Sequence, residues 1–284
     1  MSIWIDDIEV ILTGNFIKYA NVAPESYELI GDHEALIKKI LAYRRGVDIV
    51  SFGQRLPNTE PRYKYFNDWE EVAALKITTY DHWLSKQIIK ENKKNIAKAA
   101  KKGIIVRESK YDDEFVNGIM DIYNESPYRQ GKRFLHFDKD FETVRVENGT
   151  YCDKSIFIGA YYKDSLIGFV KLFLSERCAS TLQVISKIEH RDKKPTNALL
   201  AKTVEICASR GIQYLQYGVW SSGSLGKFKT YNGFEKMLLP KYYVPVTLKG
   251  KAAIAARLHR GIRSVVPRKV VEAAIYLRSK WYYQ

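Results

Sequence analysis

The sequence predicts a mixed α/β (α+β) fold, in which one sheet of mixed strand direction is flanked by helices. Apolar runs of strand length, such as residues 156–162, alternate with segments of helical periodicity, such as 196–210. The two-residue turn at 163–164 joins two strands into a hairpin, which adds antiparallel pairing. The chain has 284 residues, 46% of them hydrophobic, and so it can bury a sizeable core.

The first 110 residues are expected to form a mixed N-terminal subdomain that ends in a lysine-rich helix. That helix is predicted over 81–103, with Asp81 or Ser85 as its N-cap and Gly103 as its stop signal. Strand composition and the flanking turn residues place the strands of this subdomain at 47–56, 71–80 and 104–109, with a turn at 57–61.

A second region, 111–249, alternates strands and helices more regularly. It opens with a helix over 112–126, whose periodicity buries Phe115, Ile119 and either Ile122 or Tyr123. A basic, aromatic loop, 127–137, follows. The later elements are expected as strands at 155–162, 165–174 and 180–188, a helix at 196–210, a strand at 212–220, a short helix at 224–231, and strands at 234–240 and 242–247.

The net charge of +14 is concentrated in two segments. Residues 86–107 carry eight basic residues against one acidic residue, and residues 246–284 carry nine against one. The tail, 250–284, is predicted to form two amphipathic helices separated at Pro267. The first segment suits a polyanion, and the tail suits either an anionic membrane surface or packing on the protein itself.

Other compositional features exclude several classes of protein. No apolar run is long enough to span a bilayer, and the acidic start lacks a signal peptide's basic region, so we expect a cytoplasmic protein. The three cysteines are far apart without a C-x-x-C pair, and the five histidines show no paired spacing. We expect no disulfide framework and no metal site.

The start of the helix at 196–210 is the strongest candidate for an anion site. Arg191, Lys193 and Lys194 precede it, and Thr196 or Asn197 is the expected N-cap. A helix N-terminus offers free N–H groups and partial positive charge, which suit phosphate. The loop follows a predicted strand, and sheets of this kind bind ligands beyond the carboxyl ends of their strands. A capped helix preceded by a solvated basic loop is the alternative interpretation.

The order of elements over 112–247 resembles the GNAT fold of N-acetyltransferases. Those enzymes hold the acyl-CoA pyrophosphate on a Q/R-x-x-G-x-G/A loop, and here the corresponding segment, 191–197, contains no glycine. A second GNAT signature, F-Y-x-x-x-G-F, has its counterpart at 228–234. In this chain Lys229 replaces the tyrosine of that signature.

Both departures resemble the Fem-type branch of peptidoglycan aminoacyltransferases. This branch has a proline and an "NALL"-like start to the helix, matched at 195–200, and an "FK" pair before the glycine, matched at 228–229. It also has a lysine-rich helix ending in K-A-x-K-K-G-I/V-x-V, matched at 98–106. The resemblance covers roughly 47–247. It implies a GNAT-like twisted mixed sheet flanked by helices, a partial GNAT-like N-terminal subdomain before it and the basic helical tail after it.

The resemblance implies transfer of an acyl (acetyl-like) or aminoacyl group to an amine, by direct attack of that amine. The acceptor is expected on a cell-envelope glycan or peptidoglycan precursor, such as a sugar nucleotide or a lipid-linked glycan. The donor is expected to be acyl-CoA (acetyl-CoA) or an aminoacyl-tRNA, and the basic segment 86–107 is the candidate contact for tRNA. The alternative is a non-catalytic RNA-binding protein on a GNAT-like fold.

The implied catalytic residues are Lys229 for phosphate or developing negative charge, Glu189 as the base and Tyr217 to polarise the carbonyl. The basic loop is expected to border the acceptor groove, where its candidate residues are Arg129, Arg133 and His136. We expect the Lys229→Ala substitution to abolish transfer with little change in melting temperature.

Overall fold

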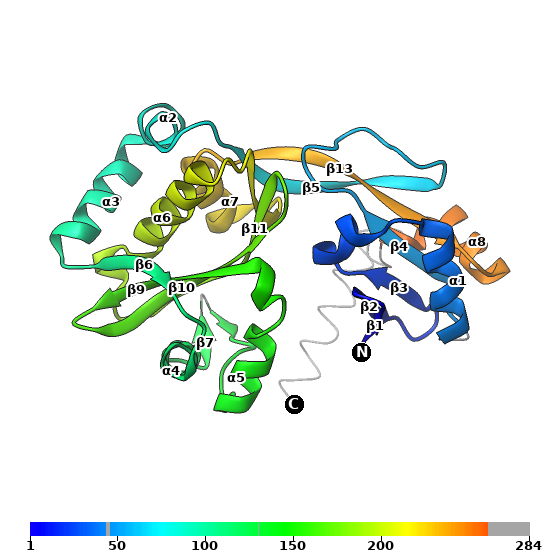
Figure 1. The fold of residues 1–284 in the computed structure, drawn as a ribbon, viewed down its shortest axis with the longest axis horizontal. Helices are drawn as coiled ribbons and strands as arrows, with labels where there is room; N and C mark the ends of the chain where they lie inside the picture. Colours follow the sequence, from blue (N-terminus) through cyan, green and yellow to red (C-terminus); the bar gives the residue numbers. More distant parts are fainter. Residues whose placement is uncertain (44–45, 130, 261–284) are drawn as a thin grey trace, which may run out of the picture. The chain divides into compact units, whose positions relative to one another are not determined.

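The computed structural model describes residues 1–43, 46–129 and 131–260, and the chain forms two compact units (Figure 1). Among the described residues, unit 1 combines those up to Glu70 with those from Leu239 to Arg260, and unit 2 is the segment from Glu71 to Leu238. This division differs from the predicted boundaries at 110 and 249. The reason is that the lysine-rich helix packs within unit 2, whereas the chain after Leu239 pairs with strands of unit 1.

Unit 1 is built on a sheet whose strands follow the order β1-β2-β3-β4-β13. The pairs are antiparallel, except that β3 and β4 run parallel. Residues Leu36 and Ile40 of the first helix are buried in the core of this unit. The elements are β1 (Ser2–Ile5), β2 (Ile8–Thr13), β3 (Tyr19–Val22), a 3-10 helix (Pro24–Leu29), α1 (His33–Tyr43), β4 (Ile49–Gly53), β13 (Glu235–Pro245), α8 (Leu248–Ala255) and a 3-10 turn (Leu258–Arg260).

Unit 2 contains a sheet with the strand order β5-β12-β11-β10-β9-β6. All neighbours are antiparallel except β11 and β12, which run parallel. The predicted hairpin is confirmed, and its turn residues Lys163 and Asp164 have φ of 49° and 64°. The strands are β5 (Phe66–Lys76), β6 (Ile105–Ser109), β9 (Ser155–Tyr162), β10 (Ser165–Leu174), β11 (Cys178–Ser186) and β12 (Tyr214–Val219).

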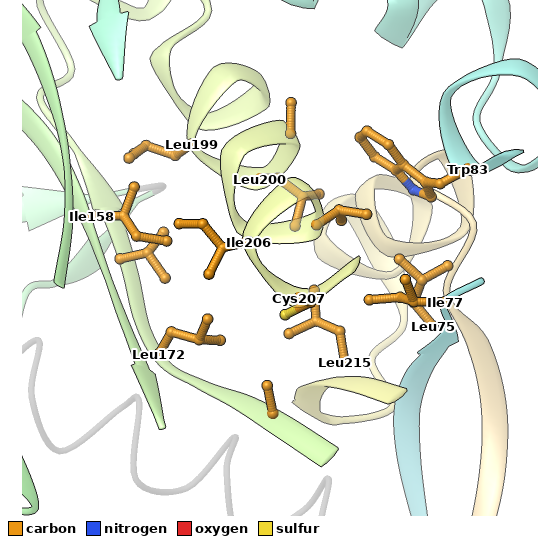
Figure 2. Packing of buried hydrophobic residues seen from close by; sticks show 14 of the residues in the cluster. Leu75, Ile77, Trp83, Ile158, Leu172, Leu199, Leu200, Ile206, Cys207 and Leu215 are labelled. Carbon is orange, nitrogen blue, oxygen red and sulfur yellow. The ribbon is translucent and has the colours of Figure 1, made fainter. Parts of the chain in front are cut away.

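Helices cover both faces of this sheet because successive side chains along its strands point into two different apolar clusters, one on each face. In β10, Val170 and Leu172 join a cluster with α6 (Pro195–Ser209), whose inner side chains include Leu199 and Leu200 (Figure 2). Phe169 joins the other cluster, with α4 (Asp113–Tyr123) and α5 (Phe141–Asn148). Helix α3 (Lys90–Lys101) packs against α6. Segment 127–137 contains the short pair β7 (Tyr128–Arg129) and β8 (Lys132–Arg133).

The predicted single helix over 81–103 is wrong, as are its two proposed caps. Thr79 caps α2 (Tyr80–His82) by accepting a hydrogen bond from His82 N at 3.0 Å, a π-helical turn (Trp83–Gln87) follows, and the helix restarts as α3. Trp83 is fully buried, and its indole N–H donates to Asn232 O at 2.9 Å. The free energy gained by burying the Trp83 side chain exceeds the cost of interrupting the regular α-helix at this point. Gly103, with φ of 80°, ends α3 as predicted.

Three further expectations differ from the structure. The two strands predicted at 234–240 and 242–247 form one strand, β13, and α5 was not predicted at all. The tail's first helix is α8, which begins at Leu248 with Thr247 as its N-cap. The second predicted tail helix, beyond Pro267, lies outside the described residues, so its contact with an anionic membrane stays a prediction.

Candidate functional site

The site begins where two parallel strands separate. Strands β11 and β12 pair at only three register positions, from Cys178↔Tyr214 to Ser180↔Gln216. The later part of β11, from Val184 to Ser186, then lines a pocket of about 490 Å³ together with Tyr217 of β12. Helix α6 starts after the carboxyl end of β11, so its N-terminus also reaches this pocket. The predicted placement of a helix start beside the carboxyl end of a central strand is confirmed.

The first turn of α6 has no side-chain cap. The N-cap is Lys194, in the left-handed conformation with φ of 62°, and Pro195 occupies the first helical position. The prediction of Thr196 or Asn197 as the cap is wrong, because Thr196 Oγ1 instead shares a 2.9 Å hydrogen bond with Ser186 Oγ. The partial positive charge of this helix end is therefore not neutralised by an acidic or hydroxyl cap.

The pocket combines positive charge with an apolar wall. Among the described residues that line it, three are basic, namely Arg129, Arg191 and Lys194, and none is acidic. The apolar part of its lining consists of Phe134, Val184, Ile185, Pro195, Leu225 and Phe228. This arrangement suits a ligand with an anionic group at one end and an uncharged part at the other.

Tyr217 lies at the pocket, and Lys229 contacts its ring from the side away from the pocket. Tyr217 faces the pocket, and burial raises the pKa of its phenol to about 12, so the O–H keeps its proton at neutral pH. Lys229 is 3% exposed and is absent from the pocket lining. Its ammonium lies 5.0 Å from the centre of the Tyr217 ring and donates to Val219 O at 2.7 Å and Ser221 Oγ at 3.1 Å. Burial lowers the pKa of Lys229.

Two predicted residues of the helix-start region do not line the pocket. The carboxylate of Glu189 is 61% exposed and lies 3.3 Å from His190 Nε2. The Lys193 ammonium lies over the Tyr162 ring, 5.0 Å from its centre, and 3.4 Å from Asp192 Oδ1. The pocket brings together Arg191, Lys194, Thr196 and Asn197 of the predicted donor group, in that order along the chain.

The predicted acceptor group is also split. Arg129 lines the pocket, but Arg133 is exposed on β8 and does not. His136 packs on the Tyr123 ring at a centroid distance of 4.6 Å and on the lining residue Phe134 at 5.2 Å, but does not itself line the pocket. Its pKa is lowered, first by burial and then by the nearby Lys139.

The lysine-rich motif at 98–106 touches the same region. Lys102, just after α3, forms a 2.9 Å ion pair with Asp192, which lies next to the pocket residue Arg191. Both side chains are about half exposed, so the pair adds little to stability. Two motifs 90 residues apart in the sequence are therefore neighbours in unit 2.

Sequence reasoning missed Glu125 and Ser186. Glu125 accepts hydrogen bonds from the backbone N–H groups of Ile188 and Glu189, and Ser186 both lines the pocket and contacts Thr196. The available signal was the spacing of Glu125 and Arg129, four residues apart. That spacing is common for ion pairs on helices. Here, however, α4 ends at Tyr123, so neither residue of the pair lies on the helix.

Two features are absent from the described part of the chain. Within it, no group of three or more His, Cys, Asp or Glu side chains is placed to hold a metal ion. Among its helices, none has both the length and the apolar character needed to cross a bilayer.

No protein-family model matches the chain, and no curated protein sequence matches it significantly. Several solved structures, however, are similar to this one. FemX has 10% sequence identity and a TM-score of 0.57, over 82% of this chain and 83% of FemX. The C-terminal domain of a putative lysylphosphatidylglycerol synthetase from Agrobacterium fabrum has 11% identity and a TM-score of 0.56, over 91% of this chain and 88% of that domain.

L-PGS from Bacillus licheniformis is similar to the same degree, with 12% identity and a TM-score of 0.53 over 88% of this chain and 85% of that one. At such identities, likeness establishes the fold. The predicted resemblance to Fem-type proteins of GNAT fold is confirmed at that level, as is the mixed α/β class with helices flanking the sheet.

Proposed function

We propose that this protein is a Fem-like acyltransferase that moves an acyl or aminoacyl group from an anionic carrier to an amine on a cell-envelope precursor. The observation that carries the proposal is the pocket between β11 and β12, with three basic residues and no acidic residue among its described lining. The names of the structural neighbours, FemX and lysylphosphatidylglycerol synthetase, support an aminoacyl group and an envelope acceptor.

In this proposal, the anionic end of the donor binds at the start of α6. Arg191 and Lys194 supply full charges there, and the uncapped first turn supplies oriented N–H groups. The reacting carbonyl then lies toward Tyr217 and the apolar wall. Aminoacyl-tRNA carries a phosphate on the same nucleotide as its reactive ester, and acyl-CoA carries its pyrophosphate at the far end of the pantetheine arm. Both donors therefore join an anionic group to a reactive carbonyl, the aminoacyl-tRNA over a short distance and acyl-CoA over a longer one.

The chemistry is direct attack of the acceptor amine on the donor carbonyl. A C–N bond forms, the C–O or C–S bond to the carrier breaks, and the tetrahedral intermediate carries negative charge on the former carbonyl oxygen. The protonated Tyr217 hydroxyl is suited to donate a hydrogen bond to that oxygen or a proton to the leaving group. Lys229 supports Tyr217 from behind, through its contact with the ring.

The amine must also lose a proton, and Glu189 stays the predicted base. Its carboxylate is exposed beside His190, outside the pocket lining, so it would act at the mouth of the site. A Glu189→Gln variant tests this role. If Glu189 is the base, the pH–rate profile loses its acidic limb. An unchanged profile would reject the assignment.

The first test of the proposal is a transfer assay with matched variants at the helix start. Wild-type protein is incubated with labelled acyl-CoA or aminoacyl-tRNA and a panel of amine acceptors. We expect Arg191→Ala and Lys194→Ala to raise the donor KM about tenfold, since each removes a charge from the pocket. Lys193→Ala is the control, because Lys193 lies outside the lining. Absence of transfer to every acceptor would contradict the proposal.

The second test separates the two donors. On α3, Lys90, Lys94 and Lys98 are exposed at four-residue spacing, which places them along one side of the helix. If the donor is aminoacyl-tRNA, filter binding should show affinity that falls steeply with salt and weakens when these lysines become glutamine. No tRNA affinity at low salt would leave acyl-CoA as the donor.

The same row of lysines supports the alternative function, a non-catalytic RNA-binding protein. The alternative predicts RNA binding that is indifferent to the pocket. Tyr217→Phe and Lys194→Ala would then leave RNA affinity unchanged, and no acyl transfer would occur. Acyl transfer that depends on Lys194 would eliminate this alternative.

A further inference from the structure

At the wall of the pocket, the Glu125 carboxylate and the Arg129 guanidinium form hydrogen bonds that connect three segments of unit 2. Glu125 follows α4, and Arg129 lies on β7. The two side chains are 3.1 Å apart, and each is only 15% exposed. We call this pair the 125–129 clamp.

The carboxylate holds the chain just beyond β11. Glu125 Oε2 accepts from Ile188 N at 2.7 Å and Oε1 accepts from Glu189 N at 2.9 Å, while Arg129 Nη2 donates to Oε2. Two consecutive backbone N–H groups therefore point at one carboxylate. This chain segment leads directly to Arg191 and Lys194, so its position sets theirs.

The guanidinium holds the end of β11 and the end of α4. Arg129 Nη1 donates to Ser186 O at 2.8 Å, and Nη2 donates to Ile122 O at 2.7 Å. The planar group also lies 4.5 Å from the centre of the Phe134 ring, which lines the pocket. Ser186 in turn shares a hydrogen bond with Thr196, so the connection continues to the first turn of α6.

The pairing changes the role expected for Arg129. Its charge is balanced by Glu125, and its two terminal nitrogens donate to two carbonyls and a carboxylate, while its buried Nε has no hydrogen-bond partner among the described residues. The cations left for a substrate anion in the described lining are Arg191 and Lys194. Arg129 therefore shapes the wall of the pocket and is poorly suited to bind an acceptor carboxylate, which sequence reasoning had expected of it.

We propose that Glu125 is a positioning residue for the donor-anion site. Through the 125–129 clamp it fixes the end of β11 and residues 187–190, and thereby holds Arg191 and Lys194 toward the pocket. The proposal rests on the proposed function for the identity of the donor, but its central claim concerns anion binding alone. A glutamine cannot replace this glutamate, because its amide group would turn an N–H toward either a backbone N–H or the Arg129 guanidinium.

The test measures binding of inorganic pyrophosphate by calorimetry and, separately, the steady-state kinetics of transfer. We expect Glu125→Gln to weaken pyrophosphate binding and raise the donor KM about tenfold, with kcat at saturating donor and the acceptor KM within twofold of wild type. Glu142→Gln is the matched control, since it also removes a carboxylate from an ion pair with arginine, at 2.9 Å, but on an exposed part of α5. It should change neither quantity.

A second variant guards against misfolding. Arg129→Lys keeps the charge but loses the planar fork, and should shift pyrophosphate affinity in the same direction as Glu125→Gln. If circular dichroism shows that Glu125→Gln does not fold, the Arg129→Lys result decides.

Several outcomes would overturn the proposal. These are unchanged pyrophosphate affinity in the folded variant, lack of pyrophosphate binding by wild type, or a fall in kcat with unchanged donor affinity, which would make Glu125 part of the chemistry. If wild type transfers no acyl group but Glu125→Gln still weakens pyrophosphate binding, the proposed function fails and the positioning role stands.

Discussion

Lys229 shows how far one residue's role depends on its surroundings. The sequence places it in a signature where GNAT enzymes carry a tyrosine, and so indicates a charge facing substrate. In the structure its ammonium is buried behind Tyr217 and bonded to Val219 O and Ser221 Oγ. Removing it takes the charged donor from both groups and leaves Val219 O with the longer, 3.3 Å hydrogen bond from Ser221 Oγ, so we now expect a loss of stability as well as of activity.

The first prediction compares two lysines of α7 (Gly223–Tyr231). Lys229→Met should lower the free energy of unfolding by about 2 kcal/mol, because two partly buried acceptors lose a charged donor. Lys227→Met, at an exposed position of the same helix, should change it by less than about 0.5 kcal/mol. Urea unfolding measures both. Unchanged stability with lost transfer would return Lys229 to a directly catalytic role.

The second prediction separates the effect of the backbone conformation of Lys194 on stability from the effect of its charge on anion binding. This residue has φ of 62°, where glycine is favoured, so Lys194→Gly should be more stable than Lys194→Ala by about 1 kcal/mol. Both variants lack the ammonium, and both should lose pyrophosphate affinity equally. Thermal unfolding and calorimetry provide the two measurements. An alanine variant at least as stable as the glycine variant would show that the conformation is not strained.

At the scale of elements, the parallel pair β11–β12 creates the site. Its three register positions hold the strands together at one end, and α6 fills the space beyond them on one side. The helical segment before α3 shows the opposite situation, in which packing interrupts an element. There Trp83 enters the core between the β5 strand end and α6, and the helix changes to a π-helical turn around it (Figure 2).

The third prediction tests where that helical segment begins. Thr79→Ala should lower the free energy of unfolding by about 1 kcal/mol, because His82 N loses its side-chain acceptor. Ser85→Ala is the control, since Ser85 is exposed and does not cap the segment. Chemical denaturation distinguishes the two. An equal or larger effect at Ser85 would favour the start that the sequence had suggested.

At the scale of the whole molecule, the chain leaves unit 1 within β5 and returns to it within β13. The return segment is secured by Asp48, whose side chain is 5% exposed. Its carboxylate accepts hydrogen bonds from Lys18 N at 2.9 Å and Thr247 Oγ1 at 2.8 Å, and lies 2.9 Å from the Lys249 ammonium. Burial alone would raise the pKa of Asp48, but these partners together lower it below 3.8.

The fourth prediction is the pH dependence that follows. Because the folded pKa is below the unfolded value, Asp48 contributes stability above pH 3.8 that is lost as the pH falls through the folded pKa. Asp48→Asn should therefore cost about 2 kcal/mol at neutral pH, and the difference from wild type should shrink in acid. Urea unfolding across this pH range measures it. Asp6→Asn, which removes an exposed carboxylate paired with Lys39, is the control and should change the free energy of unfolding at neutral pH by less than about 0.5 kcal/mol.

Much of the fold was predictable, for reasons that particular elements show. The strands of β9 and β10 are apolar runs joined by a two-residue turn, and α6 is a long apolar segment, buried on most sides, that ends before Gly211, so local pattern was enough. Helix α5 was missed because only Val144 and Asn148 are buried on it, which gives a weak period. The three strands before residue 47 were also missed, because strands of four to six residues offer little pattern, and so was α1, although its buried Leu36 and Ile40 have helical spacing.

The sequence by itself determined the mixed α/β class, the Fem-like resemblance and the helix start that supplies Arg191, Lys194, Thr196 and Asn197 to one pocket. The class and the helix start follow from periodicity and neighbouring residues, and the resemblance follows from short sequence motifs, all of which are local. Only the tertiary structure decided that Lys229 is buried and that Arg133 and His136 lie outside the pocket lining. It also decided that the Glu125 carboxylate accepts hydrogen bonds from the backbone beyond β11. Those outcomes depend on which distant groups satisfy a buried charge or N–H, and such pairings arise only when the chain has packed.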